Sequence, residues 1–375
     1  MHGMNKIRVL IIDDSLLIRK MLTDILNSSS TIEVLGSAAD PLIARAMIKQ
    51  LNPDVLTLDI EMPHMDGLTF LRNLMRLRPT PVVMISTLTE QGAEATLKAL
   101  ALGAVDFIPK PKVDSNHRLD EYAEEIIAKV KIAARANVKN AENSLVKSLD
   151  FGATKSAVFA RPAVDGILKR AFLKKQANSH HRIIAIGAST GGTEAVKTVA
   201  RGLPADTPAV FITQHLPAAF SESFVRHIDL TTQMSAGIPQ HNQPVEAGHI
   251  YLAPGDRHMM VVKDGGKYVI QLSDDLPVNR HKPAVDVLFR SIAHSAGADA
   301  IGVLLTGMGT DGASGLQEMH AAGAKTVIQD EPSSVVWGMP GAAFKLGCAD
   351  YIVPLAEVAN KILTLLGQGS ICKPV

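Results

Sequence analysis

Three polar residues in the second half of the chain have the types used in nucleophilic catalysis. Ser189, His215 and Asp311 each follow, within a few residues, a short apolar run that predicts a buried strand. The runs are 183–186, 209–212 and 301–305. Because consecutive strands of a parallel sheet end at the same edge, we expect the three loops to meet there. They would then supply a nucleophile, a base and an orienting carboxylate.

The loops around Ser189 and Asp311 are rich in glycine, at 187–192 and 307–312. Small neighbours let a substrate carbonyl approach Ser189, and the 307–309 backbone could aim an N–H at a developing oxyanion. The same glycines could instead cradle a nucleotide phosphate. They fit neither the dinucleotide fingerprint nor a Walker loop. The spacing favours a hydrolase and leaves nucleotide binding open.

A second set of polar residues follows four predicted strands in the first half. Asp13, Asp14 and Asp59 are three carboxylates at one expected sheet edge, and Mg²⁺ is the natural cation to relieve their repulsion. With the metal bound, one carboxylate can attack a phosphoryl group. Ser86 could donate a hydrogen bond to that group, and Lys110 adds positive charge. Strand-end aspartates often cap helices instead, but the combined pattern favours a phosphate switch.

The surrounding elements predict two α/β domains. Apolar strands alternate with amphipathic helical stretches up to about residue 130, and the alternation resumes from residue 183. Each domain is expected to be doubly wound around a mostly parallel sheet. The run 264–266 (Asp-Gly-Gly) between two apolar stretches predicts a β-hairpin in the second domain. The expected boundaries are 1–130 for the first domain, 131–180 for a linker, 181–370 for the second domain and 371–375 for a tail.

Charge and composition narrow the function classes. The chain has 375 residues, a formal net charge of +1 and 46% hydrophobic residues, enough for two cores. Net charge is −4 over 1–125, +9 over 126–182 and −4 over 183–375. We interpret the basic middle as a solvated tether rather than a nucleic-acid arm, because it lacks interleaved aromatic residues. Two cysteines without a CxxC pattern argue against a disulfide framework or a zinc site. The absence of a signal peptide or a long apolar run predicts a cytoplasmic protein that is not inserted in a membrane.

Residues 6–130 resemble a response-regulator receiver domain, above all over the stretch 58–67. The resemblance implies Mg²⁺ in this domain and a histidine kinase of chemotaxis as phosphodonor. It also implies roles for individual residues: Asp59 as phosphoacceptor, Asp13, Asp14, Asp59 and the Glu61 backbone carbonyl as metal ligands, Ser86 and Lys110 as phosphoryl contacts, and Phe107 as the aromatic that changes rotamer.

Residues 183–368 resemble the catalytic domain of the chemotaxis protein-glutamate methylesterases. The matching stretches are 187–192, 214–217, 247–255, 281–289, 305–315 and 329–340. The resemblance implies that Ser189 is the nucleophile, His215 the base and Asp311 the orienter. It places Thr190 and the Met308 backbone N–H near the oxyanion, and it implies no cofactor in this domain.

Together the resemblances imply a phosphorylation-activated serine esterase. Its substrates would be glutamate γ-methyl esters on the cytoplasmic domains of methylated chemoreceptors, with methanol released and receptor glutamine also deamidated. Two alternatives are a response regulator with a DNA-binding output and a nucleotide-dependent enzyme. The acidic second domain without a helix-turn-helix pattern argues against the first, and the missing dinucleotide fingerprint against the second.

Two further expectations concern the cleft. Phe220 and Phe224 lie four residues apart, which indicates helix packing. His258 and His281 could line the cleft, although packing explains them equally well. We also expect the unphosphorylated first domain to cover the Ser189 cleft, a direction that comes from the family resemblance.

Overall fold

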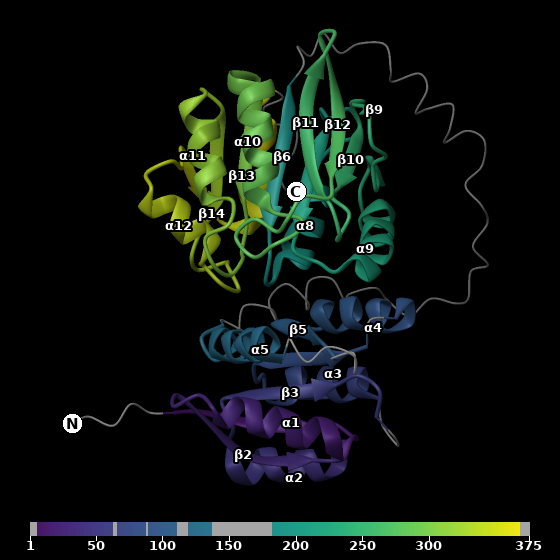
Figure 1. Ribbon diagram of the computed structural model, residues 1–375, viewed down its shortest axis with the longest axis vertical. Coiled ribbons are helices and arrows are strands. Elements are labelled where there is room, and N and C mark those ends of the chain that lie inside the picture. Colours follow the sequence, from purple (N-terminus) through teal and green to yellow (C-terminus); the bar gives the residue numbers. More distant parts are fainter. Residues whose placement is uncertain (1–5, 63–65, 88, 111–118, 137–181, 368–375) are drawn as a thin grey trace, which may run out of the picture.

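The computed structural model describes residues 6–62, 66–87, 89–110, 119–136 and 182–367 (Figure 1). Most of the predicted linker, residues 137–180, and all of the predicted tail lie outside the described residues.

The first domain is a five-stranded parallel sheet in the order β2-β1-β3-β4-β5, with helices in the connections. Its elements are β1 (Ile7–Ile12), α1 (Leu16–Asn27), β2 (Ile32–Ala38), α2 (Pro41–Leu51), β3 (Val55–Asp59), α3 (Gly67–Leu77), β4 (Val82–Ser86), α4 (Glu90–Ala101), β5 (Asp106–Pro109) and α5 (Leu119–Ala133).

Local sequence explains where several of these helices begin. Ser15, Asp40, Asp66 and Thr89 precede α1 to α4, and each side chain accepts a hydrogen bond from a backbone N–H of the first turn. β3 and β4 are buried along their whole length and β1 is buried from Val9 onward, as parallel strands covered by helices on both faces require, whereas the edge strand β2 is largely half-exposed.

The second domain has a seven-stranded parallel sheet in the order β15-β14-β13-β6-β7-β10-β8. A three-stranded antiparallel sheet, β11-β12-β9, stands beside it. The elements are β6 (Ile183–Ala188), α8 (Gly192–Arg201), β7 (Val210–Gln214), α9 (Ala218–Thr231), β8 (Ser235–Gly237), β9 (Gln243–Pro244), β10 (His249–Leu252), β11 (His258–Asp264), β12 (Lys267–Ser273), α10 (Val285–Ser295), β13 (Ala300–Leu304), α11 (Ala313–Ala321), β14 (Lys325–Gln329), α12 (Met339–Lys345), β15 (Tyr351–Val353) and α13 (Val358–Leu365).

The predicted fold class is confirmed in both domains, including the hairpin. β11 and β12 are joined through Gly265 and Gly266, whose φ angles of 53° and 84° suit a tight turn that needs two left-handed residues. The short strands β8, β9 and β10 were not predicted, because two to four residues carry too little alternation to be recognised.

The two domains pack against each other through α4 and β5 of the first and α8 and α9 of the second, and Glu124 of α5 pairs with Arg280 of the second domain (Figure 1). The Phe107 ring of β5 stacks on the Phe220 ring of α9, with centroids 4.7 Å apart. Packing was the expected role of Phe220, but its partner is the other domain rather than its own helix alone. The contact brings the first domain to the edge of the second sheet where the expected catalytic loops lie.

Candidate active site and acidic site

The loop that carries Ser189 is held by hydrogen bonds on both sides of the residue. The Ser189 N–H donates to the Thr306 carbonyl at 3.0 Å, and the Ser189 carbonyl accepts from the Gln214 side chain at 2.9 Å. A Cβ on Gly192 would lie 2.1 Å from the Gln214 Oε1 atom, so only glycine lets the start of α8 approach this closely. The Ser189 hydroxyl is therefore presented from a fixed backbone.

Ser189, His215 and Asp311 lie together in one hydrogen-bonded chain. His215 Nδ1 is 3.1 Å from Ser189 Oγ, and His215 Nε2 is 2.9 Å from Asp311 Oδ2. The residues meet because β6, β7 and β13 are neighbouring parallel strands whose following loops share one edge. With its proton on Nε2, directed at Asp311, the imidazole has a free Nδ1 lone pair for the Ser189 hydroxyl proton.

Asp311 is almost fully buried and accepts several hydrogen bonds. Asn279 Nδ2 donates to Oδ1 at 2.9 Å, and the Val285 N–H donates to Oδ2 at 2.7 Å. Burial opposes ionisation, but the His215 and Asn279 contacts outweigh it and lower the pKa of Asp311 to about 2. The carboxylate thus stays ionised beside His215 at neutral pH.

Asn279 was missed at the level of sequence. Its amide bridges Asp311 to a second buried carboxylate, Asp286, at 2.7 Å. Its φ of 53° is left-handed, a conformation that asparagine tolerates better than most residues. A lone asparagine in a loop gives no signal of such a bridge.

His281 and His258 have different environments. His281 stacks on the catalytic-site imidazole of His215, with centroids 3.7 Å apart and an interplanar angle of 13°. Burial, reinforced by His215, lowers the pKa of His281 to about 4, so it is neutral at pH 7. His258 is buried and bonded to backbone groups of Leu276 and Ala284, which fits the packing interpretation.

The 307–309 loop passes directly beside the serine. A Cβ on Gly307 would lie 2.9 Å from the Ser189 Cβ. The Gly307 N–H and carbonyl are bonded to Val336 and Met339, which fixes the loop. Within the part of the chain that the structure describes, no acceptor takes the Met308 N–H, so this donor is free for a ligand.

Thr190, the residue next to the serine, is bonded across the domain boundary. Its hydroxyl donates to Asp106 Oδ2 of β5 at 2.5 Å, and both residues are buried. Lys129 Nζ lies 3.4 Å from the other Asp106 oxygen and donates to the Phe107 carbonyl at 2.6 Å. Although burial opposes it, Asp106 and Glu125 hold the pKa of Lys129 above its usual value. An acidic side chain of the first domain, paired with Lys129, thus contacts the residue next to the nucleophile.

The acidic residues of the first domain also meet. One carboxylate oxygen from each of Asp13, Asp14 and Asp59 lies within 4.8 Å of the others. Lys110 Nζ lies 2.8 Å from Asp59 and 3.4 Å from Asp13 Oδ2, which is buried and accepts no hydrogen bond. Burial, with Asp13 nearby, raises the pKa of Asp59 to about 6. Clustered carboxylates with an unsatisfied buried oxygen fit a hard divalent cation such as Mg²⁺.

Glu61 and Ser86 lie at the same edge with other partners. The Glu61 N–H is 3.4 Å from Asp59 Oδ1. The Ser86 hydroxyl accepts from Thr96 of α4 at 2.6 Å, and no hydrogen bond among the described residues joins it to Asp59. Ser86 therefore links the acidic edge to α4, the helix that packs on the second domain.

Comparison with known proteins covers almost the whole chain. The family described as CheB methylesterase matches residues 184–362, and the response regulator receiver domain matches residues 9–121. A protein-glutamate methylesterase/protein-glutamine glutaminase of Hydrogenovibrio crunogenus is 50% identical, over 97% of this chain and 100% of its own length. A relative so named from Xanthomonas euvesicatoria is 55% identical, over 96% of this chain and 98% of its own. The solved Thermotoga maritima CheB methylesterase catalytic domain is 32% identical with a TM-score of 0.49, covering 50% of this chain and 99% of that one.

No helix within the described ranges is both long and apolar enough to span a bilayer.

Proposed function

The chain belongs to the CheB methylesterase family, and we propose that it is a phosphorylation-activated protein-glutamate methylesterase that also acts as a protein-glutamine glutaminase. The observation that carries this proposal is the hydrogen-bonded chain Ser189–His215–Asp311. The DNA-binding and nucleotide-dependent alternatives are set aside, because residues 184–362 match the methylesterase family instead.

The geometry supports an acyl-enzyme mechanism. Ser189 Oγ attacks the γ-carbonyl carbon of the glutamyl methyl ester while its proton passes to His215 Nδ1. Asp311 stabilises the imidazolium. The Met308 N–H, which has no acceptor among the described residues, would donate to the developing oxyanion near Thr190. The C–O bond to methoxide then breaks, and His215 returns the proton so that methanol leaves. Water, deprotonated by His215, cleaves the glutamyl–Ser189 ester. Glutamine follows the same steps with ammonia as the leaving group.

The acidic site supports phosphoryl transfer to Asp59. Asp13, Asp14, Asp59 and the Glu61 backbone carbonyl would hold Mg²⁺, which supplies positive charge against the phosphoryl oxygens when bound. Asp59 takes the phosphoryl group from a chemotaxis histidine kinase, and Lys110 pairs with it. The role of Lys110 rests on its contact with Asp59 in the unphosphorylated chain.

The domain contacts support occlusion of the active site before phosphorylation. Asp106 accepts the hydrogen bond of the Thr190 hydroxyl. Phe107, the proposed switch aromatic, is buried against Phe220. A phosphoryl group on Asp59 would attract the Ser86 hydroxyl away from Thr96 of α4. Because α4 packs on α8 and α9, that rearrangement loosens the same interface that carries Asp106.

We place the protein in the cytoplasm, where the methylated domains of chemoreceptors are its substrates and no nucleic acid is involved. The domain boundaries that we propose are those expected from the sequence, with residues 131–180 joining the receiver and catalytic domains.

The decisive test of the triad is Ser189→Ala. Methanol release from methylated receptor membranes should be abolished, while the melting curve stays close to that of the wild type. Ser28→Ala, an exposed serine after α1, serves as the control and should keep full activity. Wild-type turnover in the folded Ser189→Ala protein would refute the assignment of the nucleophile.

A further inference from the structure

The outer face of the receiver domain carries an apolar groove between α2 and α3. Its volume is about 540 Å³, and its floor is formed by Ile48, Phe70 and Leu74, all nearly buried. Leu42 and Leu77 stand at its edges with roughly two thirds of their surfaces exposed, at 67% and 68%. Two large aliphatic side chains left in water beside an apolar floor indicate a surface that a partner covers.

The rim of this groove is uniformly basic. Arg45, Lys49, Arg76 and Arg78 line it, and no acidic residue does. Arg78 is bonded to the Ile48 carbonyl and to the Asn52 side chain. Within the described ranges, no carboxylate pairs with any of these four side chains. The groove therefore combines an apolar floor with positive charge that is free for a ligand.

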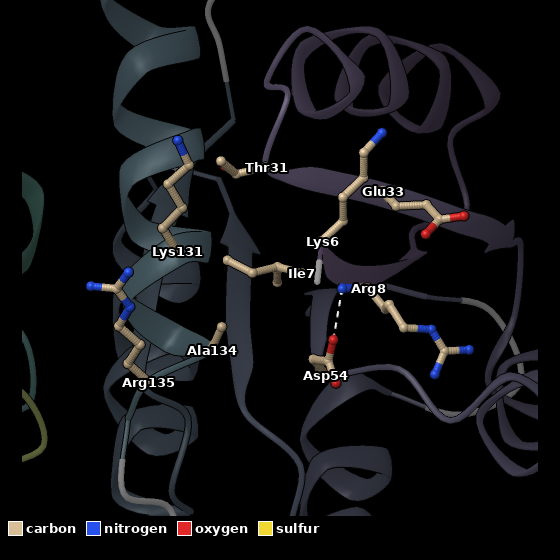
Figure 2. Close-up of a pocket in the computed structure, with 9 residues that line it drawn as sticks. All are labelled: Lys6, Ile7, Arg8, Thr31, Glu33, Asp54, Lys131, Ala134 and Arg135. Atoms are coloured by element: carbon tan, nitrogen blue, oxygen red, sulfur yellow. Dashed lines mark hydrogen bonds between the residues drawn. The ribbon is translucent and has the colours of Figure 1, made fainter. Parts of the chain in front are cut away.

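A second hollow of this domain lacks that combination (Figure 2). It lies at the opposite edge of the sheet from the acidic site, has a volume of about 920 Å³, and mixes charges of both signs. Lys131 and Arg135 line it together with Glu33 and Asp54, and Asp54 accepts the Arg8 N–H at 2.8 Å. A lining with side chains of both charges favours neither an anionic nor a cationic ligand.

The chain's own undescribed segments do not suit the α2–α3 groove. The region 126–182, which includes the undescribed residues 137–181, has a net charge of +9, and residues 1–5 and 368–375 contain no aspartate or glutamate. A basic segment on a basic rim is repelled. The occupant must therefore bring its own negative charge.

The position of the groove leaves it open to a partner in the occluded chain. The catalytic domain contacts α4, β5 and Glu124 of α5, whereas α2 lies at the far end of the receiver domain in Figure 1. We propose that the α2–α3 groove is a docking site for an acidic amphipathic helix of another protein. Its apolar face would enter the groove between Leu42 and Leu77, and its carboxylates would pair with Arg45, Lys49 and Arg76.

The test uses the full-length protein and a synthetic probe. The probe is a fluorescein-labelled amphipathic helix with leucine along one face and glutamate on both flanks, and its partner peptide has lysine in place of glutamate. Fluorescence anisotropy should show at least about tenfold tighter binding of the glutamate peptide, and the preference should shrink at high salt.

Matched variants locate the binding. Arg45→Glu/Arg76→Glu reverses two rim charges and should weaken the glutamate peptide at least about tenfold. Lys20→Glu/Arg72→Glu makes the same change in net charge at exposed positions outside the groove and should alter binding less than about twofold. Leu77→Ser should weaken binding without changing charge. Methanol release should be the same in all of these proteins.

Three results would overturn the proposal. The first is equal binding of the glutamate and lysine peptides, or no binding of either. The second is an equal loss in both charge-reversal variants, which would reflect overall charge only. The third is a wild-type dimer in sedimentation that Arg45→Glu/Arg76→Glu dissociates, which would make a second copy of this chain the occupant.

Discussion

Replacing Asp106 by alanine should raise the activity of the unphosphorylated enzyme. In the structure, which we propose to be the occluded state, Asp106 Oδ2 accepts a hydrogen bond from the Thr190 hydroxyl at 2.5 Å, and Lys129 lies beside the other Asp106 oxygen. The substitution removes a buried hydrogen bond to an acidic side chain that pairs with Lys129, and it leaves Lys129 with Glu125 and the Phe107 carbonyl. Both changes destabilise the occluded arrangement, and neither touches Ser189, His215 or Asp311.

The expected size follows from the kind of contact that is lost. A hydrogen bond to a charged group contributes about 1.5–3 kcal/mol. Because this hydrogen bond exists only in the closed state, its removal would shift the equilibrium toward the open state by roughly 10- to 150-fold. Basal methanol release should rise by at least about tenfold, unless it first reaches the rate of the phosphorylated enzyme.

Glu124→Ala provides a control at the same interface. Glu124 pairs with Arg280 of the catalytic domain at 3.3 Å, but both side chains are largely exposed, at 71% and 87%. Exposed pairs contribute about 0–1 kcal/mol, so basal activity should rise less than about fivefold. The assay is methanol release from methylated receptor membranes, with and without acetyl phosphate.

The reasoning fails if Asp106→Ala leaves the basal rate within about twofold of the wild type. It also fails if Glu124→Ala has the larger effect. With acetyl phosphate the variant should reach the wild-type plateau; a lower plateau would show that Asp106 supports the active enzyme rather than restraining it.

Three further predictions concern the acidic site, the domain arrangement and the pH response. Asp59→Asn should gain no phosphoryl group from acetyl phosphate by intact-mass measurement, and EDTA should abolish labelling of the wild type; full labelling of the variant would move the acceptor elsewhere. The fragment 147–375 should be faster than the unphosphorylated whole chain and insensitive to phosphodonor; an equal or lower rate would contradict occlusion. The pKa of His281 is about 4 in the folded chain and 6.5 in the unfolded chain, so its contribution to stability is complete above pH 6.5 and is lost as pH falls toward 4. At 1.36 kcal/mol per pKa unit, this pH-dependent part of the free energy of unfolding is at most about 3 kcal/mol. In urea unfolding, the wild type should lose more stability between pH 7 and pH 4 than His281→Gln, by up to that amount.

The sequence by itself determined which chemistry gathers at each sheet edge. Ser189, His215 and Asp311 follow apolar runs, and a parallel sheet brings the ends of its strands to one side whatever the lengths of the connections. The same rule joined Asp13, Asp14 and Asp59. Such predictions need only local sequence patterns and the direction of the strands, so they do not require the side-chain contacts.

Tertiary structure decided the contacts that those patterns do not encode. Asn279 reaches Asp311 across 32 positions, and Thr190 reaches Asp106 across 84, between domains. For His281 the sequence left open whether it lines the cleft or packs, and only the folded structure stacks it on His215. A hydrogen bond or a stacked ring pair depends on the relative positions of two chain segments in the folded protein. That arrangement is set by the packing of whole helices and domains, and no spacing along the chain reports it.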